Sequence, residues 1–434
     1  MSASKKPHLN MIVTGHIDNG KSTTMGHMLL ELGLIDERTI AQHAEESEKH
    51  GKGDTFKYAW VLDNIKDERE RGITIDLAFQ KFETPKYFFT LIDAPGHRDF
   101  IKNMITGASE ADCAVLVLSA KEGECDTAIA PGGQAREHAF LLRTLGVGQL
   151  IVAINKMDDS NYSEQAFKAA KEKAEKLIKS VGYKVESVPI VPVSGWKGDN
   201  LVKKSENMKW WTGKTLYESF DDFKLPEKPV GKPLRIPIQD VYTITGVGTV
   251  PVGRVETGIV KPGQKIVVMP SGAAGEIKTI ETHHTQMESA EAGDNIGFNL
   301  RGIDKKDIKR GDVIGTPDNP PNVAKEFRAQ IIVIHHPTAI APGYTPVMHA
   351  HTAQVAATIV AFEAKINPQT GAVEEKDPKF LKAGDSAIVR IRPVRPLPIE
   401  TFQDFPELGR FALRDMGATI AAGVVKDITE KYTA

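Results

Sequence analysis

Apolar and polar positions follow one pattern over the first half of this 434-residue chain and another over the second half. In residues 1–224, short apolar runs alternate with stretches whose apolar positions recur every three to four residues, which is typical of a parallel α/β sheet. The clearest helix is expected at Glu164–Val181, and Gly182 follows it as a stop signal. Its apolar stripe consists of Phe167, Ala170, Ala174, Leu177, Ile178 and Val181. Strands are expected at the apolar runs 9–13, 87–92, 114–119, 149–154 and 188–193.

A proline-rich segment, 225–234, separates this pattern from short alternating runs that turn signals such as Pro262-Gly263 interrupt. Such runs are typical of small β-barrels, and proline-rich segments are typical of stiff, extended linkers. A second break at Thr316–Pro321 divides the β-rich part in two. We therefore predict an α/β domain with a mostly parallel sheet, followed by two β-barrel domains. The predicted boundaries are 1–224 for the first domain, 225–234 for the linker, and 235–322 and 323–434 for the barrels.

Composition narrows the classes of function. The net charge is −2, and charged residues make up 26% of the chain. Any nucleic-acid surface must therefore be local, which disfavours a DNA-coating protein. No apolar run approaches the length of a membrane span, and the polar residues 1–7 do not resemble a signal peptide, so we expect a cytoplasmic protein without a membrane partner. Two cysteines, Cys113 and Cys125, make no disulfide framework.

The segment Gly15–Ser22 matches the phosphate-loop pattern G-x-x-x-x-G-K-[ST] and lies between an expected strand and an expected helix. Its glycines let the backbone turn tightly enough for N–H groups to face a phosphate, and the helix N-terminus adds a favourable partial charge. Lys21 can reach the β- and γ-phosphates, and the Ser22 hydroxyl can bind Mg²⁺. We therefore predict a P-loop and a nucleoside triphosphate site that includes Gly15, Asp18, Asn19, Gly20, Lys21, Ser22 and Thr23.

Guanine is the predicted base, because residues 155–158 read N-K-M-D and follow the apolar run 149–154. The Asp158 carboxylate can accept two hydrogen bonds from the edge of guanine, a pattern that adenine does not supply. Asn155 can add a bond to the base, and the stem of Lys156 can cover its face. A four-residue match alone is weak, but its place after a phosphate loop and at the end of a later strand makes it specific. The residues expected to close the base pocket from the other side are Ser194, Gly195 and Trp196.

Two further segments distinguish a GTP switch from a simple nucleotide-binding protein. Asp93 ends an expected strand and can hold Mg²⁺ through water, and the Gly96 N–H can bond the γ-phosphate that GDP lacks. Upstream, the Thr74 hydroxyl can complete the Mg²⁺ shell together with Ser22. The γ-phosphate would order both segments, and hydrolysis would release them. The insert 34–70 either contains short helices of its own or is a solvated switch region, and the sequence does not decide between these alternatives.

His97 directly follows Gly96, at the position where small GTPases have the glutamine that orients the attacking water. The chain contains 13 histidines, and a lone histidine is more often structural, but this one adjoins the γ-phosphate loop. We predict that His97 is catalytic by orienting water and not as a general base, because phosphoryl transfer depends on positioning and charge stabilisation. Ile17 and Ile73 can form an apolar gate beside it. No arginine finger is evident, so a partner is expected to stimulate hydrolysis.

Longer phrases of the sequence carry a specific resemblance. The stretch 93–107 reads DAPGHRDFIKNMITG, and further phrases occur at Gly53–Trp60, Arg71–Ile75, Pro251–Gly258 and Pro406–Met416. Together with the nucleotide loops, these phrases resemble the family of translation elongation factor 1-alpha, the archaeal and eukaryotic counterpart of bacterial elongation factor Tu. The resemblance extends from about residue 5 to the end of the chain. Since the lysine-rich C-terminal tail of many eukaryotic members is absent, we expect an archaeal-type member.

The resemblance implies a GTPase that alternates between GTP and GDP with Mg²⁺ and carries aminoacyl-tRNA to the ribosome. It also implies a guanine-nucleotide exchange factor as a partner. By position, it implies that the tRNA contacts are Lys102, Asn103, Glu281, Asn295 and Arg301. Recognition of a tRNA end requires phosphate contacts and a pocket for an unstacked base. From the residues alone, an ordinary barrel turn at 293–295 and a solvated charge at Arg301 would be the favoured interpretation.

Two other clusters in the barrels have competing interpretations. A basic cluster can either follow the phosphates of a tRNA stem or form a solvated barrel face, and it consists of Lys379, Lys382, Arg390, Arg392 and Arg395. Pairs of histidines occur at 283–284, 335–336 and 349 with 351. No cysteine accompanies them, and adjacent residues of a strand point to opposite faces, so we predict no zinc site there.

Three other functions stay open from the sequence. One is a GTPase of sulfate activation, which would use hydrolysis to drive adenylyl transfer. Another is a termination or rescue GTPase that carries a protein shaped like tRNA, and the third is a structural role such as actin bundling. Only a delivery factor should bind charged tRNA far more tightly than uncharged tRNA in its GTP form. Carriage of release and rescue factors is also compatible with delivery, as an additional function of an archaeal-type member.

Overall fold

The computed structural model describes residues 6–49, 56–62, 68, 74, 77–130, 132–246, 248–282, 285–367 and 372–432, without the side chains at 46–49, 56, 98 and 102. The chain forms two compact units. The first comprises Met1–Arg143 and Val147–Pro226, and the second comprises Thr144–Gly146 and Glu227–Ala434. Within the described ranges, no helix combines the length and the apolar composition that a membrane crossing requires.

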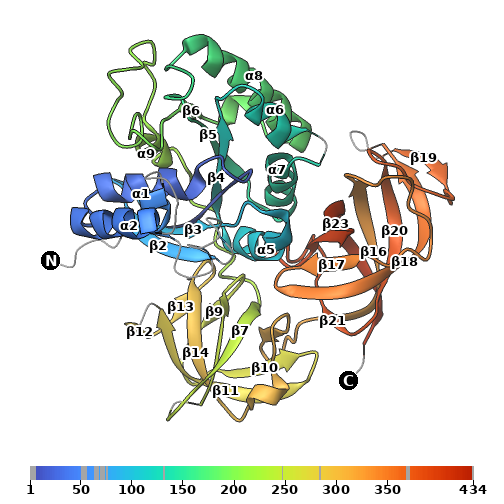
Figure 1. Ribbon diagram of the computed structural model, residues 1–434. Coiled ribbons are helices and arrows are strands. Elements are labelled where there is room, and N and C mark those ends of the chain that lie inside the picture. Colours follow the sequence, from blue (N-terminus) through green and yellow to red (C-terminus); the bar gives the residue numbers. More distant parts are fainter. Residues whose placement is uncertain are drawn as a thin grey trace. The chain divides into compact units, whose positions relative to one another are not determined.

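A six-stranded sheet forms the centre of the first unit, in the order β2-β3-β1-β4-β5-β6 (Figure 1). β1 is parallel to β3 and β4, β4 is parallel to β5, and β5 is parallel to β6. Only β2, at one edge, is antiparallel to its neighbour β3. The prediction of a mostly parallel sheet is therefore confirmed. The strands are β1 His8–Gly15, β2 Ala78–Glu83, β3 Phe88–Asp93, β4 Cys113–Ser119, β5 Gln149–Asn155 and β6 Ile190–Pro192.

Helices cover both faces of this sheet (Figure 1). On one face, Met11 of β1 shares a buried core cluster with Met25 of α1 and Phe220 of α9. On the other face, α5 packs closely, since a Cβ at Gly107 would lie 3.3 Å from the side chain of Ile12. The helices of this unit are α1 Lys21–Glu31, α2 Glu37–Lys49, α3 Phe56–Ala59, η1 Arg98–Phe100, α5 Ile101–Glu110, α6 Glu124–Ile129, α7 Gln134–Thr144, α8 Glu164–Val181, η2 Val185–Ser187 and α9 Leu216–Phe220.

The predicted helix at Glu164–Val181 is confirmed as α8 with the same bounds. All six residues of its predicted apolar stripe are buried. The Ser163 side chain accepts a hydrogen bond of 3.3 Å from the Ala166 N–H, which caps the first turn. Gly182 adopts a φ of 94°, a left-handed conformation that glycine accepts without strain, and ends the helix as predicted.

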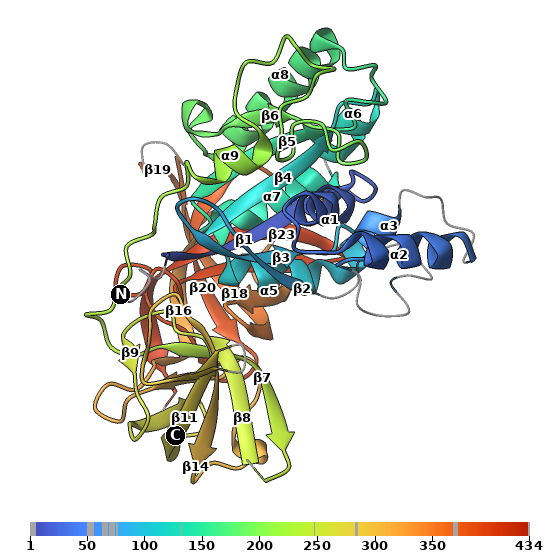
Figure 2. The same ribbon diagram turned by 90° about the vertical axis from the view of Figure 1, so that its left-hand side faces the viewer.

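The insert 34–70 lies partly outside the described residues, namely at 50–55, 63–67 and 69–70. Its described part contains α2 and α3, which lie next to α1 (Figure 2). Of the two alternatives that the sequence left open, short helices are therefore present in this part of the insert.

The second unit contains two large antiparallel sheets and a small two-stranded one, and the first of the large sheets closes into a barrel. Its strands follow the order β10-β15-β7-β8-β14-β11-β12, and the pairing of β10 with β11 closes the ring. The short strands β9 and β13 pair separately. These elements are β7 Ile236–Ile244, β8 Gly248–Arg254, β9 Ile259–Val260, β10 Lys265–Met269, β11 Ala273–Thr282, β12 Thr285–Met287, β13 Ala290–Glu291, β14 Asn295–Arg301, η3 Lys305–Asp307 and β15 Val313–Gly315.

The last sheet has the order β17-β22-β23-β16-β20-β18-β19, with β21 beside β16 and an additional pairing of β17 with β18. Its interior is a cluster of buried apolar side chains that includes Phe327, Ile391 and Phe411. The predicted class, an α/β domain followed by two β-barrel domains, is thereby confirmed. The strands are β16 Val323–Val333, β17 Val347–Ala350, β18 Ala353–Ile366, β19 Val373–Lys376, β20 Ser386–Pro393, β21 Leu397–Pro398, β22 Arg410–Asp415 and β23 Ala418–Lys431.

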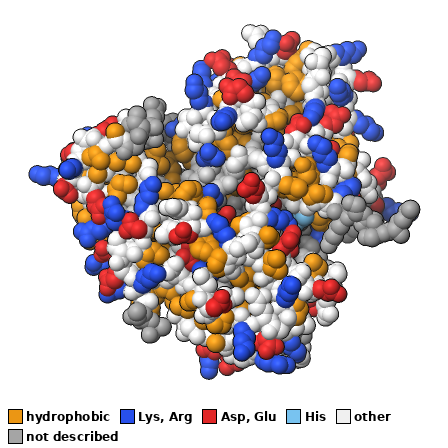
Figure 3. All heavy atoms as spheres, turned by 180° about the vertical axis from the view of Figure 1, so that it is seen from behind, with side chains coloured by type: hydrophobic (Ala, Val, Ile, Leu, Met, Phe, Trp, Pro, Cys, Tyr) orange, Lys and Arg blue, Asp and Glu red, His pale blue; other side chains and the backbone are white. Residues whose placement is uncertain are grey.

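Charges of both signs are intermixed on the surface. In the view of Figure 3, Lys and Arg side chains lie among Asp and Glu side chains over the visible face. This distribution agrees with the net charge of −2 and means that any basic binding surface has to be local.

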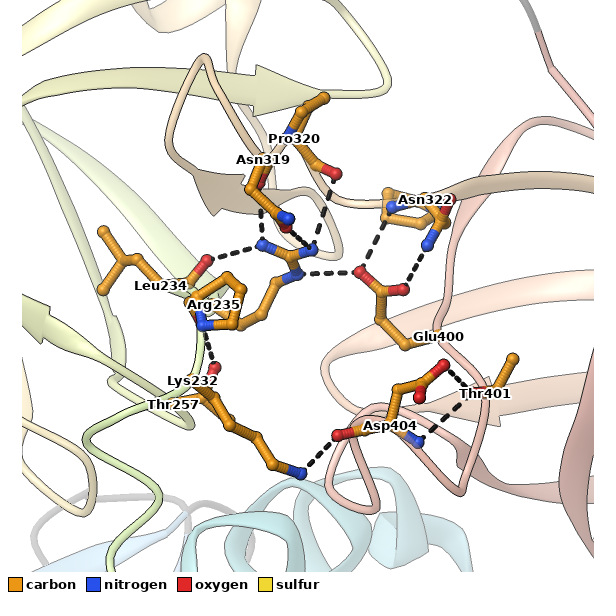
Figure 4. Close-up of polar contacts among 12 residues, drawn as sticks. Lys232, Leu234, Arg235, Thr257, Asn319, Pro320, Asn322, Glu400, Thr401 and Asp404 are labelled. Carbon is orange, nitrogen blue, oxygen red and sulfur yellow. Dashed lines mark hydrogen bonds and ion pairs between the residues drawn. The ribbon is translucent and has the colours of Figure 1, made fainter.

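A buried ion pair joins the two sheets of the second unit (Figure 4). Arg235 Nε donates to Glu400 Oε1 at 2.7 Å, and both side chains are only 2% exposed. Arg235 also donates to two oxygens of Asn319, and Glu400 accepts from the backbone and side-chain nitrogens of Asn322. The guanidinium lies 4.6 Å from the ring centre of Phe405. Such a network is costly to break, because it would leave a charge buried without a partner.

Candidate functional site

The predicted phosphate loop connects β1 to α1 and depends on two glycines. A Cβ at Gly15 would collide with the carbonyl oxygen of Val117 in β4. Gly20 adopts a φ of 79°, and a Cβ there would lie 2.5 Å from Asn155 Nδ2. The loop can therefore turn against β4 and β5 only where side chains are absent. Its last glycine is followed at once by α1, so the first N–H groups of this helix face the cavity that the loop encloses.

Lys21 and Gly96 lie against one another. A Cβ at Gly96 would collide with Lys21 Nζ, which donates a hydrogen bond of 3.0 Å to the His16 carbonyl. Two groups that favour an anion, an ammonium and a backbone N–H at a glycine, are thus brought together from segments far apart in the sequence. This arrangement suits a phosphate oxygen.

Three oxygen-bearing side chains meet beside the phosphate loop. Ser22 Oγ donates to Asp93 Oδ2 at 2.6 Å and lies 3.2 Å from Thr74 Oγ1. Burial raises the pKa of Asp93 to about 6, although the Ser22 hydrogen bond and Lys21 act in the opposite direction. Among the residues that the structure describes, none forms a hydrogen bond with the buried Asp93 Oδ1. Hydroxyl oxygens and a carboxylate oxygen that has no hydrogen-bond partner among the described residues fit Mg²⁺ and its bound water.

The predicted base pocket is built from loops at the ends of β5 and β6. Asn155 Oδ1 accepts from the Gly195 N–H at 2.8 Å, and Asn155 Nδ2 donates to the Asn19 carbonyl at 2.8 Å. Asn155 therefore ties the base loop to the phosphate loop, a role in addition to the base contact that the sequence suggested. Asp158 Oδ1 accepts from Ser194 Oγ at 2.6 Å, which orients this carboxylate.

These loops surround one cavity of about 680 Å³, large enough for a nucleotide. Of the predicted residues, those that line it are Asp18, Gly20, Lys21, Ser22, Thr23, Thr74, Gly96, His97, Asn155, Lys156, Asp158 and Trp196. The other residues predicted for the nucleotide site are buried and do not line the cavity, and they are Gly15, Asn19, Asp93, Ser194 and Gly195. Ile17 of the predicted gate also lines the cavity, whereas Ile73 lies outside the described residues.

Four lining residues were not predicted: Ala59, Asp159, Tyr162 and Lys197. Asn161 and Tyr162 adopt φ angles of 50° and 55° in the loop that brings Tyr162 to the cavity. Asparagine is enriched in this left-handed conformation, but tyrosine is not, so the position of Tyr162 has no signal in the sequence. Asp159 and Lys197 each directly follow a predicted residue, so proximity in sequence was an available signal. Ala59 belongs to the insert, and no local pattern relates it to the nucleotide loops.

His97 lines the cavity just before η1, and its side chain is 31% exposed. Its Nδ1 accepts a hydrogen bond of 3.2 Å from the Asp99 N–H. In the neutral ring this bond places the proton on Nε2, which leaves Nε2 as a donor. A donor at the edge of the cavity can orient a water molecule, whereas it cannot accept the proton of that water.

The residues predicted to contact tRNA fall in both units. In the first unit, Asn103 is half-buried in α5, and the side chain of Lys102 lies outside the described residues. In the second unit, Glu281 of β11 pairs with Gly297 of β14, so it lies near Asn295 at one end of the barrel. Arg301 is exposed at the other end of β14, opposite Glu276. Arg301 follows Asn295 by six positions of extended strand, which corresponds to about 20 Å.

Two of the five residues of the predicted basic cluster form ion pairs. Glu326 accepts from Arg390 at 3.4 Å and from Arg392 at 2.7 Å, and Glu363 lies 3.6 Å from Arg390. These ion pairs reduce the charge that these two arginines can offer to phosphates, and the choice between a tRNA-binding surface and a solvated barrel face stays open for the cluster. Histidines 283 and 284 lie outside the described residues, and His351 is buried with its Nε2 2.9 Å from the Pro398 carbonyl.

Known proteins similar to this chain give one consistent result. A family model described as the elongation factor Tu GTP binding domain matches residues 6–226. Models described as elongation factor Tu domain 2 and as GTP-eEF1A C-terminal domain-like match residues 248–315 and 326–426. A relative named elongation factor 1-alpha, from Cenarchaeum symbiosum (strain A), is 84% identical over 427 residues, which cover 98% of each chain.

More distant relatives agree. A protein of the same name from Ignicoccus hospitalis is 59% identical over 432 residues, 99% of this chain and 98% of that one. Among solved structures, the S. cerevisiae Ski7 GTPase-like domain, bound to GDP and inorganic phosphate, matches with a TM-score of 0.79. It covers 97% of both chains at 16% identity, a likeness of fold alone.

Proposed function

The chain belongs to the elongation factor 1-alpha family, and from this membership we propose that it is a translational GTPase of polypeptide elongation. In its GTP form it would carry aminoacyl-tRNA to the ribosomal A site, and after hydrolysis to GDP it would release the tRNA. The family that the sequence phrases resemble is confirmed by these relatives, and the Cenarchaeum source agrees with the expected archaeal type.

One observation carries the proposal of a GTP switch. Gly96 lies against Lys21 Nζ, and Thr74 Oγ1 lies 3.2 Å from Ser22 Oγ, so two separate segments reach the phosphate loop. A γ-phosphate at Lys21 would contact the Gly96 N–H, and a Mg²⁺ ion at Ser22 would contact Thr74. In the GDP form the Gly96 N–H would have no γ-phosphate to bind, and the contact between Mg²⁺ and Thr74 would be weaker. Occupancy of the γ-phosphate position would therefore control both segments.

Ser22 and Thr74 are the proposed ligands of Mg²⁺, and Asp93 would hold one of its water molecules. When bound, this ion would neutralise charge on the β- and γ-phosphates. The protein contributes the orientation: the Ser22–Asp93 hydrogen bond of 2.6 Å fixes the hydroxyl beside the cavity. We further propose that Asp18, Asn19 and Thr23 assist the phosphate contacts, and that Asp158 and Trp196 bind the base.

His97 is the proposed catalytic residue. Its Nε2–H would orient the attacking water toward the γ-phosphate, while Gly96 and Lys21 hold the phosphate in place. Ile17, which lines the same cavity, would restrict access of His97 to the phosphate until a partner acts. Among the described residues, Lys21, Lys156 and Lys197 are the cationic side chains that line the cavity, and none of them is an arginine, so we propose that a partner helps to stabilise the transition state. Family membership supports the ribosome as this partner.

For tRNA we propose two groups of contacts. Lys102 and Asn103 would bind near the 5′ end, and Glu281 and Asn295 would bind the aminoacylated 3′ end. Arg301, about 20 Å from Asn295 along β14, would contact the backbone of the tRNA terminus. The proposed domains are residues 1–224, the linker 225–234, and the barrels 235–322 and 323–434.

Family membership also supports further partners. We propose a guanine-nucleotide exchange factor that restores the GTP form, and carriage of release and rescue factors shaped like tRNA as an additional function. The proposed location is the cytoplasm, where ribosomes and aminoacyl-tRNA occur.

Protection of the aminoacyl ester tests the proposed function. Aminoacyl-tRNA loses its amino acid slowly in water, and a carrier that buries the ester slows this loss. We expect slower deacylation when the protein is loaded with a non-hydrolysable GTP analogue and no protection when it is loaded with GDP. Excess uncharged tRNA should not abolish the protection. Equal deacylation with both nucleotides would contradict carriage of tRNA and would favour a GTPase of metabolism.

A further inference from the structure

Three aromatic rings connect α3 of the insert to the base pocket of the first unit. His27 of α1 stacks on Tyr58 of α3, with ring centres 4.1 Å apart and an angle of 5° between the planes. Tyr58 in turn meets Trp196 edge to face, with ring centres 5.8 Å apart. Lys57 Nζ lies 5.2 Å from the centre of Tyr58 and 5.1 Å from that of Trp196. Since Trp196 lines the nucleotide cavity, these contacts form a continuous path from α3 to the cavity wall.

The base loop is held from two sides. On one side the Gly195 N–H donates to Asn155 Oδ1 at 2.8 Å. On the other side the Gly195 carbonyl lies 2.8 Å from His27 Nδ1. A carbonyl only accepts, so Nδ1 carries a proton in this contact. The same imidazole that stacks on Tyr58 therefore positions the backbone next to Trp196.

A close backbone approach adds to this contact. Gly26 of α1 faces α3, and a Cβ there would collide with the Tyr58 carbonyl oxygen. Only glycine lets the two helices come this close. The next residue of α3, Ala59, lines the nucleotide cavity itself. The position of α3 is thus set by both the ring stack and the helix backbone.

We propose that α3 braces the guanine pocket through the cluster of His27, Tyr58 and Trp196, and that Tyr58 is a positioning residue for the base. This inference rests on the proposed function and deepens it with a route of regulation. While α3 is docked, Tyr58 supports Trp196 directly and Gly195 through His27. When α3 leaves this position, both supports are lost and the nucleotide dissociates faster. The conformation of the insert thereby sets the rate of nucleotide release.

Substitution of Tyr58 tests this route. With fluorescent GDP and the full chain, we expect Tyr58→Leu to release the nucleotide about fivefold faster or more, because two aromatic contacts are lost. Tyr58→Phe keeps the ring and should stay within about twofold of the unmodified protein. Tyr217→Leu is a matched control, because Tyr217 is a half-buried tyrosine of the same unit that packs near Phe220 and does not line the cavity. An unchanged release rate for Tyr58→Leu would overturn the inference.

Gly26→Ala provides a second variant that separates docking from folding. Inside a helix this change normally stabilises, since alanine is the better helix former. Here the added Cβ would push α3 away, so we expect faster GDP release from a protein whose α1 is intact. Release at the rate of the unmodified protein would show that the docking of α3 does not brace the pocket.

The ratio of affinities for IDP and GDP distinguishes a loosened base pocket from general damage. IDP lacks the 2-amino group of guanine, so a well-positioned pocket discriminates against it. If Tyr58 acts through the base loop, discrimination against IDP should fall in Tyr58→Leu and in Gly26→Ala. Faster release of both nucleotides with an unchanged ratio would overturn the inference. Failure of the unmodified protein to bind GDP would instead contradict the proposed function.

Discussion

Asp158 is held in place by a hydrogen bond of 2.6 Å from Ser194 Oγ, at the edge of the cavity where the base is proposed to bind. Asp158→Asn would replace an acceptor with a donor opposite the donors of guanine. We expect the preference to shift from guanine toward xanthine, which presents an acceptor at this position. Competition between GTP and XTP for binding measures the shift. If GTP competed against XTP equally well for Asp158→Asn and for the unmodified protein, Asp158 would not recognise the base.

His97 has a different role from the binding residues around it. Its Nδ1 accepts from the Asp99 N–H, and it lies next to Gly96, so His97→Ala should leave GTP and tRNA binding nearly intact. We expect ribosome-stimulated hydrolysis to slow by several orders of magnitude, because the attacking water would lose its orientation. Single-turnover hydrolysis on ribosomes gives the rate. A rate within about threefold of the unmodified protein, about 0.7 kcal/mol of barrier, would exclude the proposed role.

His351 should make the second unit sensitive to acid. Burial lowers the pKa of His351 to about 4, so the folded state favours the neutral imidazole. Below the unfolded pKa of about 6.5, the unfolded chain binds a proton that the folded chain rejects. We therefore expect the free energy of unfolding to fall by up to about 3 kcal/mol as the pH decreases from 6.5 to 4, and no contribution from this group above 6.5.

Comparison with His351→Asn isolates this contribution. Asparagine tolerates the left-handed backbone at this position, where φ is 43°. Burial also raises the pKa of Asp312 to about 6, and this group acts in the opposite direction over the same range of pH. The free energies of unfolding of the two proteins, measured with urea, therefore have to be compared with each other at each pH between about 7.5 and 4.5. An equal pH dependence in both proteins would contradict a neutral, buried His351.

At the scale of residues, the sequence predicted those parts of the cavity that are contiguous in a motif. Lys21 and Ser22 follow Gly20 in one loop, and their chemistry requires this order. Tyr162 was not predicted as a lining residue, because its position in the cavity depends on a left-handed backbone in the loop after Asp158. The contacts of His27 were not predicted either, because a histidine within a helix carries no signal of its partners. These partners, Tyr58 and Gly195, lie in two segments remote in sequence.

At the scale of elements, prediction succeeded where one element buries one face. α8 was predicted to the residue, since its apolar stripe and the glycine at its end are both local signals. β2 was not predicted. It is an edge strand in which buried and exposed residues alternate, so it contains only a few buried positions and no continuous apolar run. α2 was left undecided, because its sequence is dominated by charged and polar residues. The Arg235–Glu400 pair was missed, since its partners are 165 residues apart.

This ion pair should stabilise the contact between the two sheets of the second unit. Glu400→Gln would leave Arg235 buried at 2% exposure without its charged partner. We expect the free energy of unfolding to fall by about 3 kcal/mol or more. Urea unfolding of the full chain measures the change. Glu172→Gln is the matched control, because Glu172 pairs with Lys176 on the surface of α8, where a single pair contributes little. Equal effects of the two substitutions would contradict a stabilising role for the buried pair.

At the scale of the whole molecule, the proposed tRNA contacts belong to both compact units. Asn103 lies in α5 of the first unit, whereas Glu281 and Asn295 lie in the first barrel of the second unit. The segment 225–234 between α9 and β7 contains no helix or strand. One tRNA end can be held by both groups only in particular arrangements of the two units. Affinity for tRNA should therefore report which arrangement is populated.

We accordingly expect the complex with a GTP analogue to bind aminoacyl-tRNA far more tightly than the GDP complex. The γ-phosphate would order the segments at Thr74 and Gly96, and these segments would favour the arrangement that accepts tRNA. A change from a 1:99 to a 99:1 population of this arrangement needs about 5.5 kcal/mol of differential binding. Loss of a γ-phosphate contact at Lys21 together with a rearranged Mg²⁺ shell can supply an energy of this size. Titration of labelled aminoacyl-tRNA into both complexes measures the difference, and uncharged tRNA serves as the control that should bind weakly to each. Equal affinity of the two nucleotide forms for charged tRNA would refute the carrier mechanism, even if both forms bound guanine nucleotide as proposed.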